Sequence, residues 1–159
     1  MTGYPLAALL RVRVFREKAA ALEITRCAQK LEEARQACKQ REQELIQYRE
    51  WRIKEETRLF EAIHNETVSM EEVERYKQAL LSLRGEEVQH EERILESKEH
   101  IRECEEALQD ARKHHMEAMK NQRKIEEHKK RWQQEEKLRL ERAEEAELEE
   151  FSSKSLLVD

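Results

Sequence analysis

The fold is decided by nine residues, HNETVSMEE at positions 64–72. They interrupt an apolar repeat that runs along most of the chain, and they contain neither glycine nor proline. Ser69 and Glu72 have the spacing of a capping box, in which a serine hydroxyl and a carboxylate satisfy free backbone donors at a helix start. The sequence therefore predicts a first helix that ends near residue 64, a reversal, and a second helix that begins at Met70.

Apolar residues on both sides of this stretch alternate at spacings of three and four, which is the repeat of a coiled-coil seam. Before the reversal the seam comprises Leu10, Ala20, Ile24, Cys27, Leu31, Ala34, Cys38, Leu45, Tyr48, Leu59 and Ala62. After it, the seam comprises Val73, Tyr76, Leu80, Leu83, Ile94, Ile101, Cys104, Leu108, Ala111, Ala118, Ile125 and Trp132. A short connection favours pairing within one chain. The expected fold is all-α, a long antiparallel two-helix coiled-coil hairpin.

Five segments follow from this pattern. We expect an N-terminal segment at 1–5, a first coiled-coil helix at 6–64, a reversal at 65–69, a second coiled-coil helix at 70–150 and a flexible C-terminal tail at 151–159. The second helix should extend past the first from about Lys129. Gly85 leaves two alternatives for the second helix, because glycine costs about 1 kcal/mol relative to alanine inside a helix: a continuous helix, or a short helix at 70–85 followed by a bend.

Four charged residues lie on seam positions, namely Glu17, Arg41, Arg52 and Glu55. Each needs a charged partner or water, because an isolated buried charge is costly. In a hairpin, paired residues should have numbers that sum to about 133, which places Arg41 near Glu91 and Glu92. In a parallel homodimer the seam arginines would face their own copies and repel, so the pattern favours the hairpin.

The composition excludes several classes of protein. Only 2 glycines and 1 proline occur among 159 residues, and 42% of residues are charged, which argues against strand-rich folds that need frequent turns. A net charge of −5 argues against nucleic acid as a partner. No apolar run is long enough to insert directly into a membrane. Three cysteines without paired spacing indicate a reducing compartment, the cytosol.

No motif for catalysis is present, because the chain has no glycine-rich phosphate loop and a two-helix fold offers no deep pocket. No pair among the six histidines has the i,i+4 spacing of a metal site. We therefore expect no enzyme activity, no cofactor and no metal.

Two groups of apolar residues exceed what the seam requires. Near the reversal, Tyr76, Leu80 and Leu83 form a stripe that either closes the hairpin or binds a partner helix. At the start, Leu9 and Leu10 lie among apolar residues that cover more than one helix face, together with Arg11, Arg13 and Arg16. This start also has features of a mitochondrial targeting peptide, although the heptad repeat passes through it.

Charge is distributed unevenly along the second helix. Residues 112–131 contain 8 Lys or Arg against 3 Glu, a net of +5, and residues 133–150 contain 3 against 8, a net of −5. The basic block should lie beside the first helix's arginines. Such a surface is either simply solvated or a docking surface for an acidic partner.

Several short motifs occur in order along the chain: Tyr4-Pro5-Leu6, Leu9-Leu10-Arg11-Val12-Arg13, Arg16-Glu17-Lys18-Ala19-Ala20, Leu59-Phe60, Val68-Ser69, Glu72, Glu74-Arg75-Tyr76, Leu80 and Leu83-Arg84. From the start to about residue 110, the chain resembles the YscO family of bacterial type III secretion, whose flagellar homologue is FliJ.

The resemblance implies a central stalk. Such proteins are antiparallel coiled coils that sit in the pore of the hexameric secretion ATPase and link it to the export gate, and members also bind secretion chaperones. By this resemblance, Leu9, Leu10, Arg11, Arg13 and Arg16 would bind the ATPase, and Tyr76, Leu80 and Leu83 would bind the cytosolic domain of the export gate.

The implied location is the bacterial cytoplasm, peripheral to the inner-membrane apparatus, and such a protein could itself be secreted. The alternative is a cytosolic coiled-coil scaffold or tether without an ATPase partner.

Overall fold

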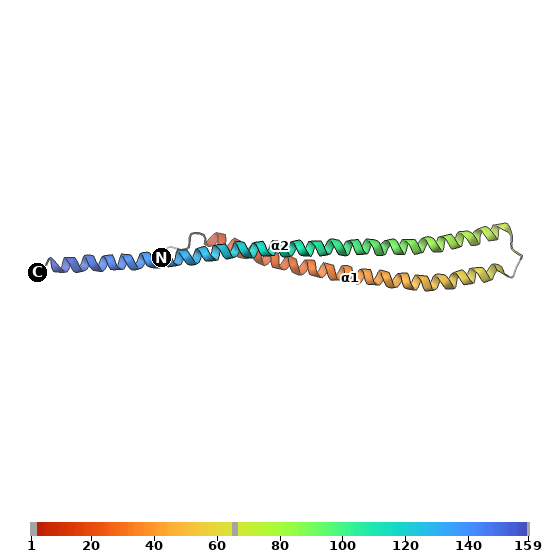
Figure 1. Ribbon diagram of the computed structural model, residues 1–159, viewed down its shortest axis with the longest axis horizontal. Coiled ribbons are helices and arrows are strands. Elements are labelled where there is room, and N and C mark those ends of the chain that lie inside the picture. The colour runs from red at the N-terminus through yellow and green to blue at the C-terminus, as the bar shows by residue number, and fades with distance from the viewer. Residues whose placement is uncertain (1–2, 65–66, 159) are drawn as a thin grey trace. The chain divides into compact units, whose positions relative to one another are not determined.

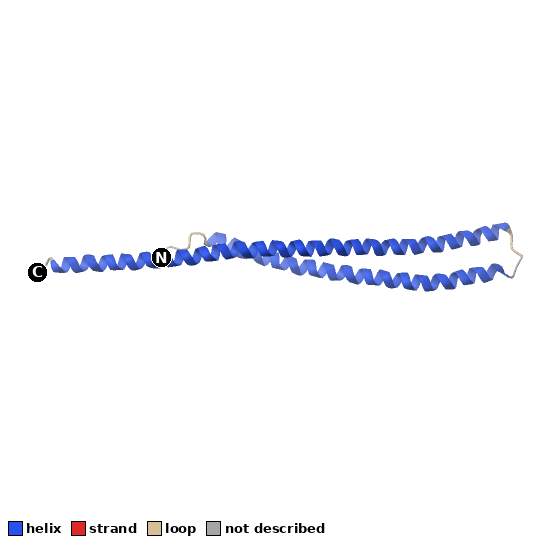
Figure 2. Ribbon diagram, in the orientation of Figure 1, coloured by secondary structure: helices blue, strands red, loops and turns tan. Residues whose placement is uncertain are grey.

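The computed structural model describes residues 3–64 and 67–158. These form two helices, α1 at Ala7–His64 and α2 at Met70–Leu156. Figure 2 shows loop only before α1, between the helices and after α2, and no strand occurs in the described ranges. The fold is therefore the expected all-α antiparallel hairpin, in which α1 and α2 lie side by side (Figure 1).

The start of α2 is capped as its sequence predicts. The backbone N–H of Glu72 donates to Oγ of Ser69 at 3.3 Å, and the N–H of Val73 donates to the Ser69 carbonyl at 3.2 Å. These bonds satisfy donors that have no partner inside the helix. Two residues of the expected reversal, Asn65 and Glu66, lie outside the described residues.

Helix α2 passes through Gly85 without interruption, so the predicted alternative of a bend there does not occur. Gly85 is exposed, and a Cβ added to it would meet nothing within 4 Å. The position therefore lies on a solvated face of the helix, where the weak helix propensity of one glycine is offset by its neighbours.

Helix α2 also continues beyond Glu150, where the sequence led us to expect a tail. It runs to Leu156, and Oγ of Ser153 donates to the Glu150 carbonyl at 3.0 Å. Residues 133–156 contain no glycine or proline and are rich in Glu, Ala, Leu, Arg and Lys. These residues lose little conformational entropy in a helix, and three serines do not interrupt it.

The chain divides into two compact units to which both helices contribute. The hairpin unit comprises residues 25–110, and the terminal unit comprises residues 3–24 and 111–158 of the described chain.

The core of both units is the predicted seam. All of the buried apolar residues in the described chain are seam residues: Ala20, Cys27, Leu31, Ala34, Cys38, Leu45, Leu83, Ile94, Cys104, Leu108 and Ala111. Most are small, and each interior position is covered by only one opposing helix. Ala62, also expected in the seam, is exposed. The three cysteines are free and buried, where they pack as small hydrophobes.

Candidate interaction surfaces

The charged seam residues find partners, as the cost of burying a lone charge requires. In the terminal unit, Nε2 of His115 lies 2.9 Å from Oε1 of Glu17. In the hairpin unit, Arg41 donates to the Arg93 carbonyl at 3.2 Å, one residue beyond the expected neighbour Glu92. Glu55 pairs with Arg58 of its own helix, whose guanidinium lowers the pKa of that carboxyl.

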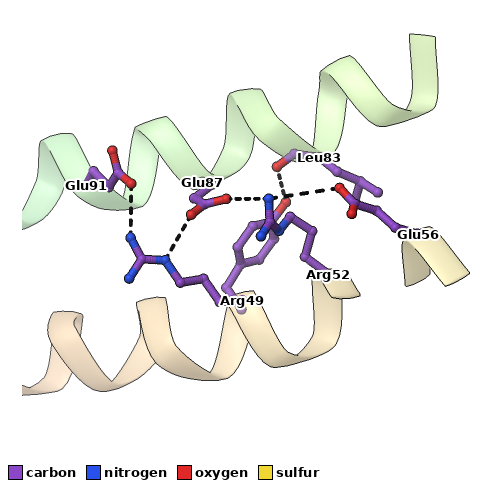
Figure 3. Close-up of polar contacts among 7 residues, drawn as sticks. Arg49, Arg52, Glu56, Leu83, Glu87 and Glu91 are labelled. Atoms are coloured by element: carbon purple, nitrogen blue, oxygen red, sulfur yellow. Dashed lines mark hydrogen bonds and ion pairs between the residues drawn. The ribbon is translucent and has the colours of Figure 1, made fainter. Parts of the chain in front are cut away.

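One cluster in the hairpin unit joins the helices through two arginines (Figure 3). Glu87 accepts from Nε of Arg49 at 2.9 Å and lies 2.8 Å from Nη1 of Arg52. Arg49 also reaches Glu91 at 3.1 Å. The numbers in these pairs sum to between 136 and 140, close to the value of 133 that we expected for the hairpin.

A tyrosine lies beside this cluster on α1. The Tyr48 hydroxyl donates to the backbone carbonyl of Leu83 on α2, and the Tyr48 ring lies 4.9 Å from the ring of His90. Burial raises the pKa of the Tyr48 hydroxyl, and the negative charge of Glu86 adds to the shift.

The N-terminal candidate residues divide between two sides of α1. Leu10 and Arg13 are half-buried toward the seam, whereas Leu9, Arg11 and Arg16 are exposed. The Nε atom of Arg13 is buried without a hydrogen-bond partner in the described chain. The five residues therefore do not form one continuous surface.

A second apolar side of α1 faces away from the seam. It comprises Leu9, Val12, Phe15 and Leu22, of which Phe15 is 72% exposed, and Arg11 and Arg16 flank it on the helix surface. An exposed apolar face rimmed by charge is typical of a binding site. We call these six residues the outer N-terminal face.

A groove of about 470 Å³ lies between the helices of the terminal unit. Small side chains form its floor, namely Ala19, Ala20 and Ala118, and Arg13, Arg16 and His114 line it as well. Two carboxylates, Glu23 and Glu117, and the amide of Asn121 complete the lining. We call it the alanine groove.

The N-terminal segment extends the pairing of the terminal unit past the start of α1. The ring of Tyr4 lies 5.4 Å from that of Trp132, and its hydroxyl is 2.6 Å from Nδ1 of His128. Pairing therefore reaches Trp132, slightly beyond the expected limit at Lys129. Among residues 133–158 only Glu136 is half-buried and all others are exposed. We call residues 133–156 of α2 the overhang.

The candidate export-gate residues face mostly inward. Leu83 is 9% exposed and belongs to the core, and Tyr76 and Leu80 are half-buried. Their neighbour Leu81 is 69% exposed. The stripe thus helps close the hairpin, which was one of the two interpretations left open by the sequence.

Two further apolar stripes escaped the sequence analysis. On α1, Ile46, Ile53 and Phe60 recur every seven residues, and on α2, Leu81, Val88 and Leu95 do the same; all six are exposed. In each heptad the seam uses a first position and a second position three residues later. Every stripe residue lies directly after a first position and therefore outside the seam. The stripes are found only when apolar side chains are also sought at heptad positions outside the seam.

The two stripes lie on one side of the hairpin unit. The Arg49–Glu91 ion pair at 3.1 Å joins the two helices. Arg49 and Glu91 occupy the same heptad position in their respective helices, and in an antiparallel pair these two positions lie on the same side of the hairpin. Arg49 is three residues after Ile46, and Glu91 is three residues after Val88, and residues so spaced are neighbours on a helix. We call the six apolar residues the two-stripe face.

No group of three or more metal-ligating side chains occurs in the part of the chain that the structure describes. Neither α1 nor α2 contains, among its described residues, an apolar stretch long enough to cross a membrane. The surfaces described above are therefore the best candidates for function.

Comparison with known proteins yields three matches. A family model described as "Type III secretion protein YscO" matches residues 6–154. The Yop proteins translocation protein O of Yersinia pseudotuberculosis is 35% identical, over 54% of this chain and 65% of that protein, so the chain covers somewhat less than two thirds of this relative. A solved structure of a YscO homologue from Chlamydia trachomatis has a TM-score of 0.76 at 20% identity, over 96% of this chain and 94% of that one, and it supports the fold.

Proposed function

Because this chain belongs to the YscO family of type III secretion proteins, we propose that it acts as a central stalk, linking the hexameric secretion ATPase to the export gate. The outer N-terminal face carries this proposal. Its apolar side chains are exposed, and so are Arg11 and Arg16. The apolar side chains of such a face are removed from water only when a partner covers them, and this burial favours binding.

The ATPase is the partner that we assign to this face. The arginines add a long-range attraction for acidic surface, and buried apolar anchors such as Phe15 would supply most of the binding energy. The candidates Leu10 and Arg13 face the seam, so their role would be to hold α1 in place rather than to touch the ATPase. No chemical step is required of the protein itself.

The export gate is the partner proposed for the end of the hairpin near the reversal. Tyr76 and Leu80 are half-buried and can contribute their accessible edges, and Leu83 would support them from the core. Exposed Leu81 extends this surface outward. The contact would be helix-in-groove recognition, which uses apolar anchors at helical spacing.

A secretion chaperone is the partner that we propose for the two-stripe face. Its six apolar residues flank the Arg49–Glu91 ion pair, so the face combines apolar contact with charged positions that select a partner. The face lies on α1 and α2 of the hairpin unit, and its residues are distinct from those assigned to the ATPase.

Turnover and oligomerisation of the cognate secretion ATPase test the stalk proposal. The wild-type protein should raise both, and the variant Arg11→Glu/Arg16→Glu should lose most of this effect while it keeps its helix content. Lys39→Glu/Gln43→Glu, which adds negative charge at exposed positions of α1 in the hairpin unit, is the control and should behave as wild type. An ATPase that does not respond to the wild-type protein would refute the stalk proposal.

A further inference from the structure

The overhang extends past the helix pair, and every one of its residues except Glu136 is exposed in the described structure. It carries exposed Leu140, Leu148 and Phe151, of which Phe151 is 76% exposed. The spacings of 8 and 11 residues place these three side chains on one side of a helix with 3.6 residues per turn. Glu144 lies on the same side, with Glu141 and Glu147 next to it. The overhang is thus an acidic amphipathic helix.

A single helix of this length is marginal in water, because its stability normally comes from packing of the apolar side. The ion pair between Arg139 and Glu136 supports it only locally. The overhang therefore has exposed apolar area that a partner could bury, and its helix would be stabilised by that partner.

The terminal unit itself offers the complementary surface. Its alanine groove includes small side chains that let a third helix approach closely, and Arg13, Arg16 and His114 line it together with Glu23 and Glu117. Residues 112–131 of α2 carry a net charge of +5, whereas residues 133–150 carry −5. The two charges are equal and opposite over segments of similar length. The overhang cannot fold back onto this surface, because it continues the same helix.

We propose that the overhang of one molecule lies in the alanine groove of a second copy, and that the second copy returns the same contact. Both surfaces belong to the terminal unit, so one two-fold axis satisfies both and the assembly closes as a dimer. Each overhang then runs parallel to α1 and antiparallel to α2 of the other copy, which makes a three-helix bundle at each contact.

The lengths agree with this arrangement. At 1.5 Å per residue the 24 residues of the overhang span about 36 Å, and residues 7–24 of α1 span about 27 Å. The overhang can therefore cover the whole α1 segment of the terminal unit. Glutamates 141, 144 and 147 would lie against Arg13 and Arg16, which line the groove together with Glu23 and Glu117, and the buried Nε of Arg13 would gain an acceptor.

The dimer does not depend on the proposed function. If the stalk proposal holds, the dimer would cover residues of α1 that are also assigned to the ATPase, and the two partners would compete. The following experiment contains no ATPase, so its failure is distinguishable from failure of the stalk proposal.

The test measures molar mass by light scattering from micromolar to millimolar concentration. The wild-type chain should shift from monomer to dimer as concentration rises, and the dimer should weaken at high salt because screening reduces charge attraction. A monomer at every concentration, or an open series of larger assemblies, would overturn the proposal.

Charge reversal identifies the interface. Arg16→Glu/His114→Glu makes the groove acidic, and Glu144→Lys/Glu147→Lys makes the overhang basic; all four residues are exposed, so the fold should persist. Each variant alone should be monomeric, because its two contacts join like charges. An equimolar mixture should form a heterodimer, in which both contacts join opposite charges.

The control variant is again Lys39→Glu/Gln43→Glu, which has the same change in charge as the groove variant and should dimerise as wild type. Two results would overturn the assignment of the interface: dimers that survive in both single variants, or a mixture that stays monomeric. Circular dichroism spectra that match wild type establish that each variant is folded.

Discussion

The hydroxyl of Tyr48 on α1 donates a hydrogen bond to the backbone carbonyl of Leu83 on α2. A helix carbonyl has a second lone pair beyond the one used within its helix, so this bond adds to the helix without breaking it. It joins two residues 35 apart in sequence and ties the helices together where Leu83 enters the core.

Replacement of Tyr48 by phenylalanine should destabilise the protein by about 1 kcal/mol, because it removes the hydrogen bond and leaves the ring contact with His90. Urea unfolding followed by circular dichroism measures the change. Tyr76→Phe is the matched control, since the Tyr76 hydroxyl makes no hydrogen bond in the described chain, and it should change stability by less than half as much. Equal effects of the two substitutions would contradict the role of the Leu83 carbonyl.

Tyr48 should also make stability depend on alkaline pH. Burial, followed by the charge of Glu86, raises the pKa of its hydroxyl above the ordinary value of 10.0. The folded state therefore holds this proton more tightly than the unfolded state, and the stabilisation is complete below pH 10 and is lost as pH rises through the folded-state pKa. Ultraviolet titration should show one tyrosine that ionises later than the others, and Tyr48→Phe should remove it. A Tyr48 that titrates with the other tyrosines would contradict this prediction.

His115→Ala should destabilise the terminal unit by about 1 to 3 kcal/mol, because Glu17 then lacks its partner at 2.9 Å on a half-buried seam position. The double variant Glu17→Leu/His115→Leu should be at least as stable as wild type, since apolar replacement removes both polar groups. Thermal unfolding of the two variants decides this. If His115→Ala has no cost, the pair contributes nothing to stability.

Glu87→Ala should be more destabilising than Glu91→Ala, although both substitutions remove an ion pair to Arg49. The Glu87 side chain is 16% exposed and serves two arginines, whereas that of Glu91 is 48% exposed and serves one. We expect a cost of about 2 kcal/mol for Glu87→Ala, where half-buried Arg52 loses its acceptor, and less than about 1 kcal/mol for Glu91→Ala. Denaturant unfolding compares the two variants: if their m-values are equal, the difference between their midpoints gives the difference in stability.

Ile53→Glu/Val88→Glu should abolish binding to a cognate secretion chaperone without loss of stability. Both residues are exposed on the two-stripe face, so a charge there costs little in the free protein but would have to be buried in the complex. Titration calorimetry measures the affinity, and Lys39→Glu/Gln43→Glu is the control. Unchanged chaperone binding would assign the face to another partner.

The helices and their seam could be predicted because a single heptad repeat determines the core of a two-helix fold. The spacing of three and four identified all the buried apolar residues in the described chain, and Ser69 with Glu72 identified the start of α2. The charged seam residues Glu17 and Arg52 required partners, and the opposing helix supplies them as His115 and Glu87.

The sequence was less informative about segments that do not pack against the other helix. Propensity alone decides the end of an unpaired helix, and three serines after Phe151 suggested a tail although α2 continues to Leu156. The stripe of Tyr76, Leu80 and Leu83 allows two interpretations from sequence, because the same apolar spacing suits closure of the hairpin and binding of a partner, and the burial of Leu83 distinguishes it from exposed Leu81. A search for seam residues also passes over Ile53 and Val88, because their repeat lies outside the seam.

The separation in sequence between paired residues has a consequence for how the protein forms. Tyr48 and Leu83 are 35 residues apart, Glu17 and His115 are 98 apart, and Tyr4 and His128 are 124 apart. Loop closure costs less for near residues than for distant ones, so pairing should begin beside the reversal and advance toward the termini. On the ribosome, α1 emerges first and must wait with its seam uncovered until α2 is synthesised. The alanine groove belongs to the unit that closes last, so a nascent chain would acquire this surface only after residues 111–132 of α2 have been synthesised.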